Sequence, residues 1–301
     1  MSKIIDLVAT GSKKDHISLK GAIQFIESIG YIPRVSTTIF GEHPLYVNQD
    51  EVRLQNLVDA LYAEDSDIIW CLRGGSGTTR LIPPLFKLNK PSKPKKLIGL
   101  SDVTALLLFL SQQWGWPVIH GPTAHYAGTH FLTPDALEKI VGLIKGTLTE
   151  LSYNGLVPLN ERAHQNQIIE ANITGGNLSL IEYSIGTSWQ ILSPDHILFL
   201  EDINEEAYRL AERLEHLQQA GIFREVRALL FGDFSHQDPA KNHPELIDFV
   251  LNDFATKINI PCFKNLPVGH VKYCCPLIMN EHVQLTTGQM GKLTQPIIRT
   301  I

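Results

Sequence analysis

Short runs of apolar residues alternate with amphipathic stretches through the first half of the chain. The apolar runs cover residues 3–9, 31–36, 67–72 and 96–100. Between them, apolar residues recur every three or four positions, first from Ile17 to Ile29 and then from Val52 to Leu61. This is the spacing of a helix with one buried side. A third helical pattern, over 102–113, follows the last run directly. The β-α-β-α order predicts an α/β fold, with a parallel sheet covered by helices on both faces.

The second half of the chain is mixed. From residue 151 to 166 polar and turn-forming residues dominate, which indicates a crossing between domains. Beyond it, β-like runs at 168–173, 196–200, 226–231 and 282–287 are interspersed with helical patterns at 177–185, 205–220 and 243–257. We therefore predict an N-terminal domain over 1–150, a linker over 151–167 and a C-terminal domain over 168–301.

Composition narrows the class of protein. The 301 residues carry 26 basic and 31 acidic side chains, a net charge of −5, so we expect no nucleic-acid partner. The longest strongly apolar run, from Ala105 to Leu110, is far shorter than the ~18 residues that span a bilayer. Asp6 interrupts what would be the apolar core of a secretion signal. We expect a cytoplasmic protein without a membrane partner, whose four cysteines are reduced and structural.

The segment Leu97-Ile-Gly-Leu-Ser-Asp-Val-Thr-Ala-Leu106 is the most informative candidate for chemistry. An apolar strand ends, Ser101 lies on the turn, and a helix begins at once. This arrangement is similar to the G-x-S-x-G elbow that exposes a nucleophilic serine, although Val103 replaces the second glycine. The alternative is that Ser101 merely caps the helix, a role that serine often has.

A glycine-rich turn, Arg73-Gly-Gly-Ser-Gly77, follows another predicted strand. Its glycines let the backbone approach a ligand closely and direct amides toward it, as an oxyanion or phosphate site requires. The turn lacks the Lys-Ser/Thr of a P-loop and the spacing of a dinucleotide fingerprint, so no nucleotide site is predicted. It is equally consistent with a simple turn.

A nucleophilic serine needs a base, and the base needs an acceptor that orients it. His270 ends the segment Asn265-Leu-Pro-Val-Gly-His270, at the close of a strand-like run, and His125 is its rival. Glu201 ends the apolar run that begins at His196, which is where a parallel strand delivers a side chain to a site. The alternative for Glu201 is an acid near the N-terminus of the following helix.

Taken together, seven segments in order resemble the LD-carboxypeptidase family of serine peptidases, which also contains microcin C self-immunity proteins. The resemblance covers nearly the whole chain. The segments are Arg73-Gly74-Gly75, Gly99 to Leu106, Gly121-Pro122, Thr174-Gly-Gly-Asn-Leu178, Leu198 to Asp202 with Tyr208-Arg209, Gly232-Asp-Phe234 and Pro267-Val-Gly-His270.

The resemblance implies that Ser101 is the nucleophile, His270 the base and Glu201 the acid that orients it. It also implies a flavodoxin-like N-terminal domain related to class I amidotransferases, a smaller β-rich α+β C-terminal domain and a homodimer. Neither a metal nor a cofactor is expected.

The resemblance further implies an oxyanion hole formed by backbone amides of Gly74 or Gly75 and of Asp102. The sequence departs from the family pattern at Ser76, where a tyrosine is usual, and we expect this change to alter the wall of the substrate cleft. It departs again at Ala9-Thr-Gly-Ser12, where Ala-Pro-Ser is usual.

The substrate that the resemblance implies is a murein tetrapeptide, cut between meso-diaminopimelate and a terminal D-alanine during recycling of cell-wall peptidoglycan. Arg73 and Arg209 are candidates, by charge alone, for binding the free carboxylate. Two alternatives remain open. One is a self-immunity peptidase that cleaves microcin C-like peptidyl-adenylates, and the other is a non-catalytic protein that binds a small ligand.

Overall fold

The structure, a computed structural model, describes residues 3–12 and 15–297, so the outermost residues of both predicted domains, 1–2 and 298–301, lie outside the described part. The chain forms two compact units. Among the described residues, the first unit contains those up to Thr147 together with Cys275–Ile278, and the second contains Leu148–Cys274 and residues 279–297. Within the described residues no helix is long and apolar enough to cross a membrane.

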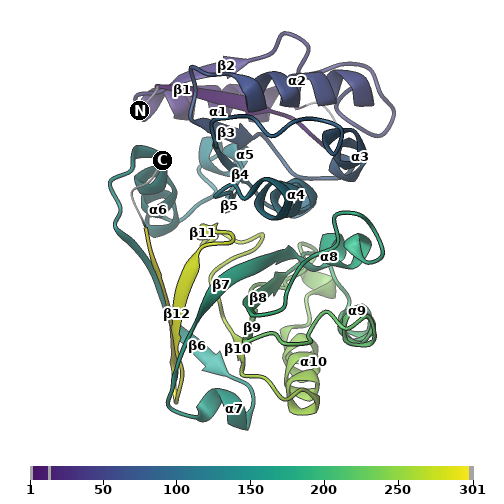
Figure 1. The fold of residues 1–301 in the computed structure, drawn as a ribbon, viewed down its shortest axis with the longest axis vertical. Coiled ribbons are helices and arrows are strands. Elements are labelled where there is room, and N and C mark those ends of the chain that lie inside the picture. Colours follow the sequence, from purple (N-terminus) through teal and green to yellow (C-terminus); the bar gives the residue numbers. More distant parts are fainter. Residues whose placement is uncertain (1–2, 13–14, 298–301) are drawn as a thin grey trace. The chain divides into compact units, whose positions relative to one another are not determined.

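The first unit is built on a sheet with the strand order β11-β5-β4-β3-β1-β2 (Figure 1). Its strands are β1 (Ile4–Val8), β2 (Ile32–Val35), β3 (Ile68–Cys71), β4 (Lys96–Gly99), β5 (Ile119–His120) and β11 (Leu277–Ile278). All neighbours pair in parallel except β11, which is antiparallel to β5. The predicted parallel sheet is confirmed.

Two groups of helices accompany this sheet. Helix α1 packs on α5, whereas α2, α3 and α4 each contact the short helix η1. Their bounds are α1 (His16–Ser28), α2 (Asp50–Tyr62), η1 (Thr78–Leu81), α3 (Ile82–Leu85), η2 (Ser101–Val103), α4 (Thr104–Trp114), α5 (Ala124–Gly128) and α6 (Pro134–Lys145). Helix α4 is buried over most of its length, as its apolar sequence predicts.

The second unit contains a closed barrel with the strand order β10-β6-β13-β12-β7-β8-β9. Strands β7, β8, β9 and β10 run parallel, and the other pairs are antiparallel. The strands are β6 (Glu150–Pro158), β7 (Ile168–Asn177), β8 (His196–Glu201), β9 (Ala228–Phe231), β10 (Cys262–Lys264), β12 (His282–Thr286) and β13 (Gly291–Pro296). The helices are α7 (Glu161–His164), α8 (Leu178–Ser184), α9 (Ala207–Gln219), η3 (Pro239–Lys241) and α10 (Pro244–Lys257).

The structure differs from the predicted linker over 151–167, because these residues form β6 and α7 inside the second unit. Leu151 and Tyr153 are buried, but the next buried residue is Leu156. The register with β13 shifts at this point, and Gly155 has a φ of 81°. A β-bulge of this kind adds one residue and breaks the alternation of apolar and polar positions. The predicted C-terminal domain of 168–301 differs as well, because the second unit begins at Leu148 and Cys275–Ile278 belongs to the first unit, where Leu277 pairs with His120.

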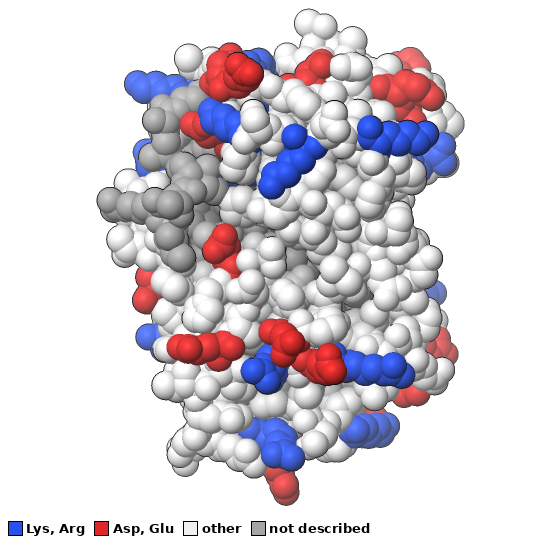
Figure 2. Space-filling model, in the orientation of Figure 1, with Lys and Arg blue, Asp and Glu red and all other residues white. Residues whose placement is uncertain are grey.

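Charged side chains of both signs are spread over the surface. On the face in Figure 2, blue and red groups are interspersed among the described residues, in keeping with the nearly balanced count of 26 basic and 31 acidic residues. All four cysteines are buried and free of disulfides.

Candidate active site

One cluster of candidate residues lies at the carboxyl ends of three neighbouring strands of the first unit. Strand β3 lies between β1 and β4, and all three are parallel. The chain therefore leaves each strand at the same edge of the sheet. The turns that follow contain Gly11, Gly74 and Ser101, respectively. Pairing of the strands thus brings together segments that lie far apart in the sequence.

Ser101 has the backbone conformation of a sharp elbow. Its φ is 66°, in the left-handed region, which costs a non-glycine residue roughly 1–2 kcal/mol. A residue that caps a helix has extended backbone angles and a side chain bonded to the first turn. Ser101 has neither, because the N-cap positions of η2 and α4 are Leu100 and Val103, and the Ser101 hydroxyl makes no hydrogen bond with the described residues. The geometry therefore favours the elbow interpretation over the capping alternative.

Gly74 lies directly against the side chain of Ser101. A Cβ atom added to Gly74 would lie 2.6 Å from Ser101 Cβ and 2.9 Å from Ser101 Oγ, closer than real Cβ contacts. Gly75 has a φ of 112°, and a Cβ atom there would lie 2.1 Å from Ser12 Oγ. The amides of Gly74 and Gly75 donate to none of the residues that the structure describes. The glycine turn thus presents free backbone donors beside Ser101, as an oxyanion hole requires.

The side chain of Asp102 ties the elbow to the end of the glycine turn. Its Oδ2 accepts hydrogen bonds from the backbone N–H of Thr78, at 2.9 Å, and from Thr78 Oγ1, at 2.6 Å. Burial raises the pKa of Asp102, and the bonds from Thr78 oppose that rise. Sequence reasoning considered only the backbone amide of Asp102 and missed this contact. The acidic residue directly after the candidate nucleophile was the available signal.

Of the remaining candidates in the first unit, Arg73 and His125 interact with residues other than Ser101, and Ser76 is exposed. Arg73 forms an ion pair with Asp15 at 2.5 Å, and Ser76 is exposed. His125, the rival base, lies with Nδ1 2.7 Å from Ser18 Oγ, which also bonds to Asp15. Burial and the nearby Arg73 guanidinium lower the pKa of His125. The structure therefore gives His125 a partner other than Ser101.

A second cluster lies at the carboxyl ends of the parallel strands of the barrel. Strand β8 ends at Glu201, and the chain that leaves β10 reaches His270. The distance from His270 Nδ1 to Glu201 Oε2 is 2.9 Å. The Glu201 side chain is fully buried, and that of His270 is 8% exposed. With Nδ1–H donating to the carboxylate, Nε2 of the imidazole is left as a proton acceptor.

The pKa of His270 is raised above the ordinary value of 6.5. Burial lowers this pKa, but the Glu201 carboxylate raises it through its charge and its hydrogen bond. Asp202 and Asp233 raise it further. Burial also raises the pKa of Glu201, and the neighbouring imidazole opposes that rise. His270 is thus a base whose protonated, positively charged form is stabilised by the surrounding carboxylates.

Two glycines and one further acid hold this pair in place. A Cβ atom on Gly269 would lie 3.2 Å from Glu201 Oε2, and one on Gly232 would lie 3.1 Å from Glu201 Cβ. Asp202, which sequence reasoning did not single out, accepts a bond from Asn177 Nδ2 at 2.8 Å. Because Asn177 ends β7 and Asp202 follows β8, this bond fixes the two strand ends beside Glu201.

Arg209, the other candidate for binding a carboxylate, lies on the exposed side of α9. Its Nε donates to the hydroxyl of Tyr208 at 3.1 Å, and the guanidinium carbon lies 5.7 Å from the centre of that ring. Within residues 3–12 and 15–297, no three His, Cys, Asp or Glu side chains are grouped as metal ligands would be.

Known proteins match both units of the chain. The LD-carboxypeptidase N-terminal domain family matches residues 5–121, and the LD-carboxypeptidase C-terminal domain family matches residues 170–285. A Rickettsia conorii protein named "Putative carboxypeptidase" is 41% identical over 261 residues, which are 85% of this chain and 80% of that protein. The murein tetrapeptide carboxypeptidase of Pseudomonas aeruginosa is 31% identical over 224 residues, 73% of this chain and 72% of that protein. The crystal structure of muramoyltetrapeptide carboxypeptidase from Oxalobacter formigenes has a TM-score of 0.83 and 26% identity, covering 99% of this chain and 100% of that chain.

Proposed function

Because the chain belongs to the LD-carboxypeptidase family of serine peptidases, we propose that its catalytic residues are Ser101 as nucleophile, His270 as base and Glu201 as the acid that orients the base. Family membership makes the protein a serine-type peptidase with carboxypeptidase activity, and so favours an enzyme over the non-catalytic binding protein. The observation that carries the assignment of roles is the buried pair of His270 and Glu201, 2.9 Å apart. The left-handed elbow at Ser101 supports it.

In the proposed reaction, His270 Nε2 takes the proton of Ser101 Oγ as the oxygen attacks the carbonyl carbon of the last peptide bond. The amides of Asp102 and of Gly74 or Gly75 stabilise the resulting oxyanion. When the intermediate collapses, His270 returns the proton to the departing amine, and the C-terminal amino acid leaves. Water, activated by the same imidazole, then releases the acyl group from Ser101.

We propose a murein tetrapeptide as the substrate and D-alanine as the first product, in the recycling of cell-wall peptidoglycan in the cytoplasm. The names of relatives from Pseudomonas aeruginosa and Oxalobacter formigenes support a peptide of this class. We keep Arg73, Ser76 and Arg209 as proposed substrate contacts. Arg73 would contact the substrate by giving up its ion pair with Asp15 and pairing with the substrate carboxylate instead. A homodimer is the proposed assembly.

The substrate proposal is tested by incubating the purified protein with three compounds and following product masses. The compounds are a tetrapeptide that ends in D-alanine, the same peptide ending in L-alanine, and a peptidyl-adenylate. We expect loss of one alanine from the first alone. Cleavage of the peptidyl-adenylate alone would instead assign the self-immunity activity, and cleavage of both alanyl peptides would contradict selectivity for an L,D bond.

The pH dependence of kcat/KM should report the proposed base. Only neutral His270 can accept the proton of Ser101, and the pKa of His270 lies above 6.5. Activity should therefore fall about tenfold per unit as the pH drops below this raised pKa. The measurement is kcat/KM for the tetrapeptide across the pH range in which the protein stays folded. A half-maximal value at or below pH 6.5 would contradict the raised pKa.

Substitution Gly74→Ala should lower kcat by about 10²–10³, the cost typical of losing one oxyanion donor. The added Cβ would lie 2.6 Å from Ser101 Cβ, so either the turn or the nucleophile must move. Overpacking should also lower the free energy of unfolding by about 1–3 kcal/mol. Gly115→Ala is the control for activity, because a Cβ there meets nothing within 4 Å, while its φ of 64° makes the substitution lower stability as well. Equal activity of the two variants would rule out the role of Gly74.

A further inference from the structure

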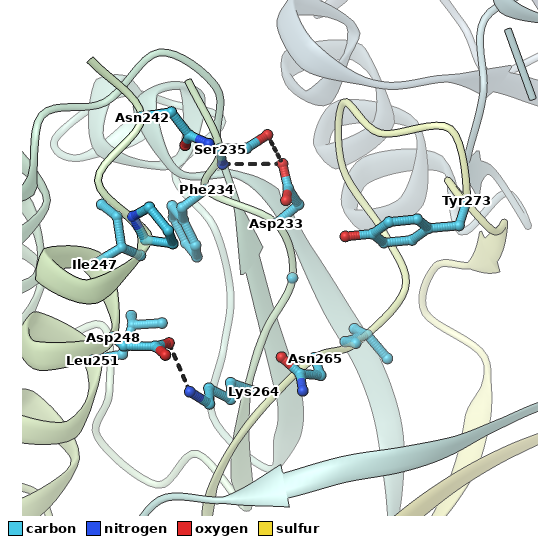
Figure 3. A pocket seen from close by; sticks show the side chains of 13 residues that line it. Asp233, Phe234, Ser235, Asn242, Ile247, Asp248, Leu251, Lys264, Asn265 and Tyr273 are labelled. Carbon is cyan, nitrogen blue, oxygen red and sulfur yellow. Dashed lines mark hydrogen bonds and ion pairs between the residues drawn. The ribbon is translucent and has the colours of Figure 1, made fainter. Parts of the chain in front are cut away.

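A pocket of about 510 Å³ opens in the second unit beside the loop that carries His270. Its walls come from the segment after β9, from α10, from the segment after β10 and from Tyr273 (Figure 3). Asp233, at its edge, packs against the residue before the base, since a Cβ atom on Gly269 would lie 3.0 Å from Asp233 Cβ. A group bound in this pocket would therefore lie close to the proposed catalytic pair.

The charged residues of the pocket leave a net negative charge. Lys264 Nζ and Asp248 Oδ1 form an ion pair of 2.6 Å on one wall, as Figure 3 shows, and these charges offset each other. Asp233 is the third charged residue of the lining. Its Oδ2 accepts bonds from the N–H and the hydroxyl of Ser235, at 3.0 and 2.6 Å. Its Oδ1 accepts no hydrogen bond from the described residues, so one carboxylate oxygen is open to a cation.

Two neutral residues with oxygen acceptors, Tyr273 and Asn265, line the pocket together with Asp233. In Figure 3 the hydroxyl of Tyr273 points toward Asp233, and Asn265 lies on the same side of the pocket. Burial and the charge of the Asp233 carboxylate raise the pKa of Tyr273, so its phenol stays protonated and neutral. Apolar side chains, including Phe234 and Leu251, complete the lining. A cation at the end of an alkyl chain matches this combination, because the chain can contact the apolar part while the charge meets the acceptors.

We propose that this pocket binds a primary ammonium group on a side chain of the peptide substrate, and so determines which peptides are cut. The ammonium donates to Asp233 Oδ1, to the Tyr273 hydroxyl oxygen and to the amide oxygen of Asn265. The inference rests on the proposed function, because it assumes a peptide bound at His270. It makes Asp233 and Tyr273 specificity-determining residues of that reaction.

The test compares two tetrapeptides that end in D-alanine and differ only at the third residue, with lysine in one and norleucine in the other. The wild-type protein should prefer the lysine peptide in kcat/KM by about tenfold or more, the value of a hydrogen bond to a charged group. Asp233→Asn should lose that preference, so that its kcat/KM values for the two peptides agree within about twofold. Both peptides are compared on the same variant at the same pH, so a change in the titration of His270 alters both rates alike and leaves their ratio unchanged.

Two further variants control for folding and for charge in general. Asp253→Asn removes a carboxylate from α10 that pairs with Lys257 outside the pocket, and should retain the lysine preference. Tyr273→Phe removes one acceptor without changing the charge, and should lower the preference about threefold. This variant tests the pocket even if Asp233→Asn does not fold.

Binding to the Ser101→Ala variant separates failure of this inference from failure of the proposed function. By calorimetry, the lysine peptide should bind about tenfold more tightly than the norleucine peptide, and Asp233→Asn should abolish the difference. Hydrolysis of both peptides at equal rates, or equal binding of both, would overturn the pocket assignment and leave the proposed function intact. Selective binding without hydrolysis by the wild type would retain the pocket and overturn the proposed reaction.

Discussion

Replacing Ser101 with alanine should lower kcat/KM for the murein tetrapeptide by about 10⁴-fold or more. The substitution removes the oxygen that forms the acyl bond in the proposed reaction. Because the Ser101 side chain forms no cap bond with η2 or α4, the fold should not depend on it. The measurement is release of D-alanine, with thermal unfolding recorded in parallel.

Ser111→Ala is the matched control for this prediction. Ser111 is a buried residue of α4, the helix that follows the elbow. Its hydroxyl donates to the backbone carbonyls of Leu107 and Leu108 in the same helix. Its loss should leave kcat/KM within about twofold of wild type. If Ser101→Ala retained more than about a tenth of the wild-type activity, covalent catalysis by Ser101 would be excluded.

The second large effect is expected for Glu201→Gln, which should lower kcat by about 10³–10⁴. The carboxylate accepts a hydrogen bond from His270 Nδ1–H and so leaves Nε2 free to act as base. A glutamine of the same shape can instead donate its amide hydrogens to Nδ1, which favours the tautomer with the proton on Nε2. That tautomer cannot take a proton from serine. The measurement is kcat at a pH well above the pKa of His270, so that the loss reflects the tautomer rather than protonation.

Glu205→Gln provides the comparison for Glu201→Gln. Glu205 is also buried, but its carboxylate lies 3.1 Å from Arg213 Nε rather than beside the imidazole. Its substitution should affect stability more than catalysis. Comparable losses of kcat in the two variants would indicate damage to the barrel in general and would contradict an orienting role for Glu201.

The sheet of the first unit could be predicted because its inner strands β1, β3 and β4 are largely buried and are separated by helices with clear apolar sides. The candidate residues could also be located from the sequence, because sites in parallel sheets lie at the carboxyl ends of the strands. Glu201 was predicted at the end of an apolar run and ends β8 in the structure. What the sequence could not give was the contact of His270 with Glu201, 69 positions apart, because it depends on the pairing of β8, β9 and β10.

Other features escaped prediction for local reasons. The bulge at Gly155 shifts the buried positions of β6 from odd to even numbers, so the strand did not show a regular alternation. Strand β11 has two residues, too few for any periodicity. Arg53 lies at helical spacing from Leu57 and Leu61 and is buried with them. Its guanidinium donates to the carbonyls of Thr10 and Gly77, acceptors that exist only once the strand ends have come together.

The central claim, that Ser101 is a nucleophile activated by His270 and Glu201, is tested most directly by labelling with a fluorophosphonate, followed by mass mapping of the modified peptide. The probe reacts with an activated serine but not with one that only caps a helix. We predict one adduct, on the peptide that contains Ser101, whose formation slows sharply in Glu201→Gln. Absence of labelling in the folded protein, or an adduct on another serine, would contradict the claim.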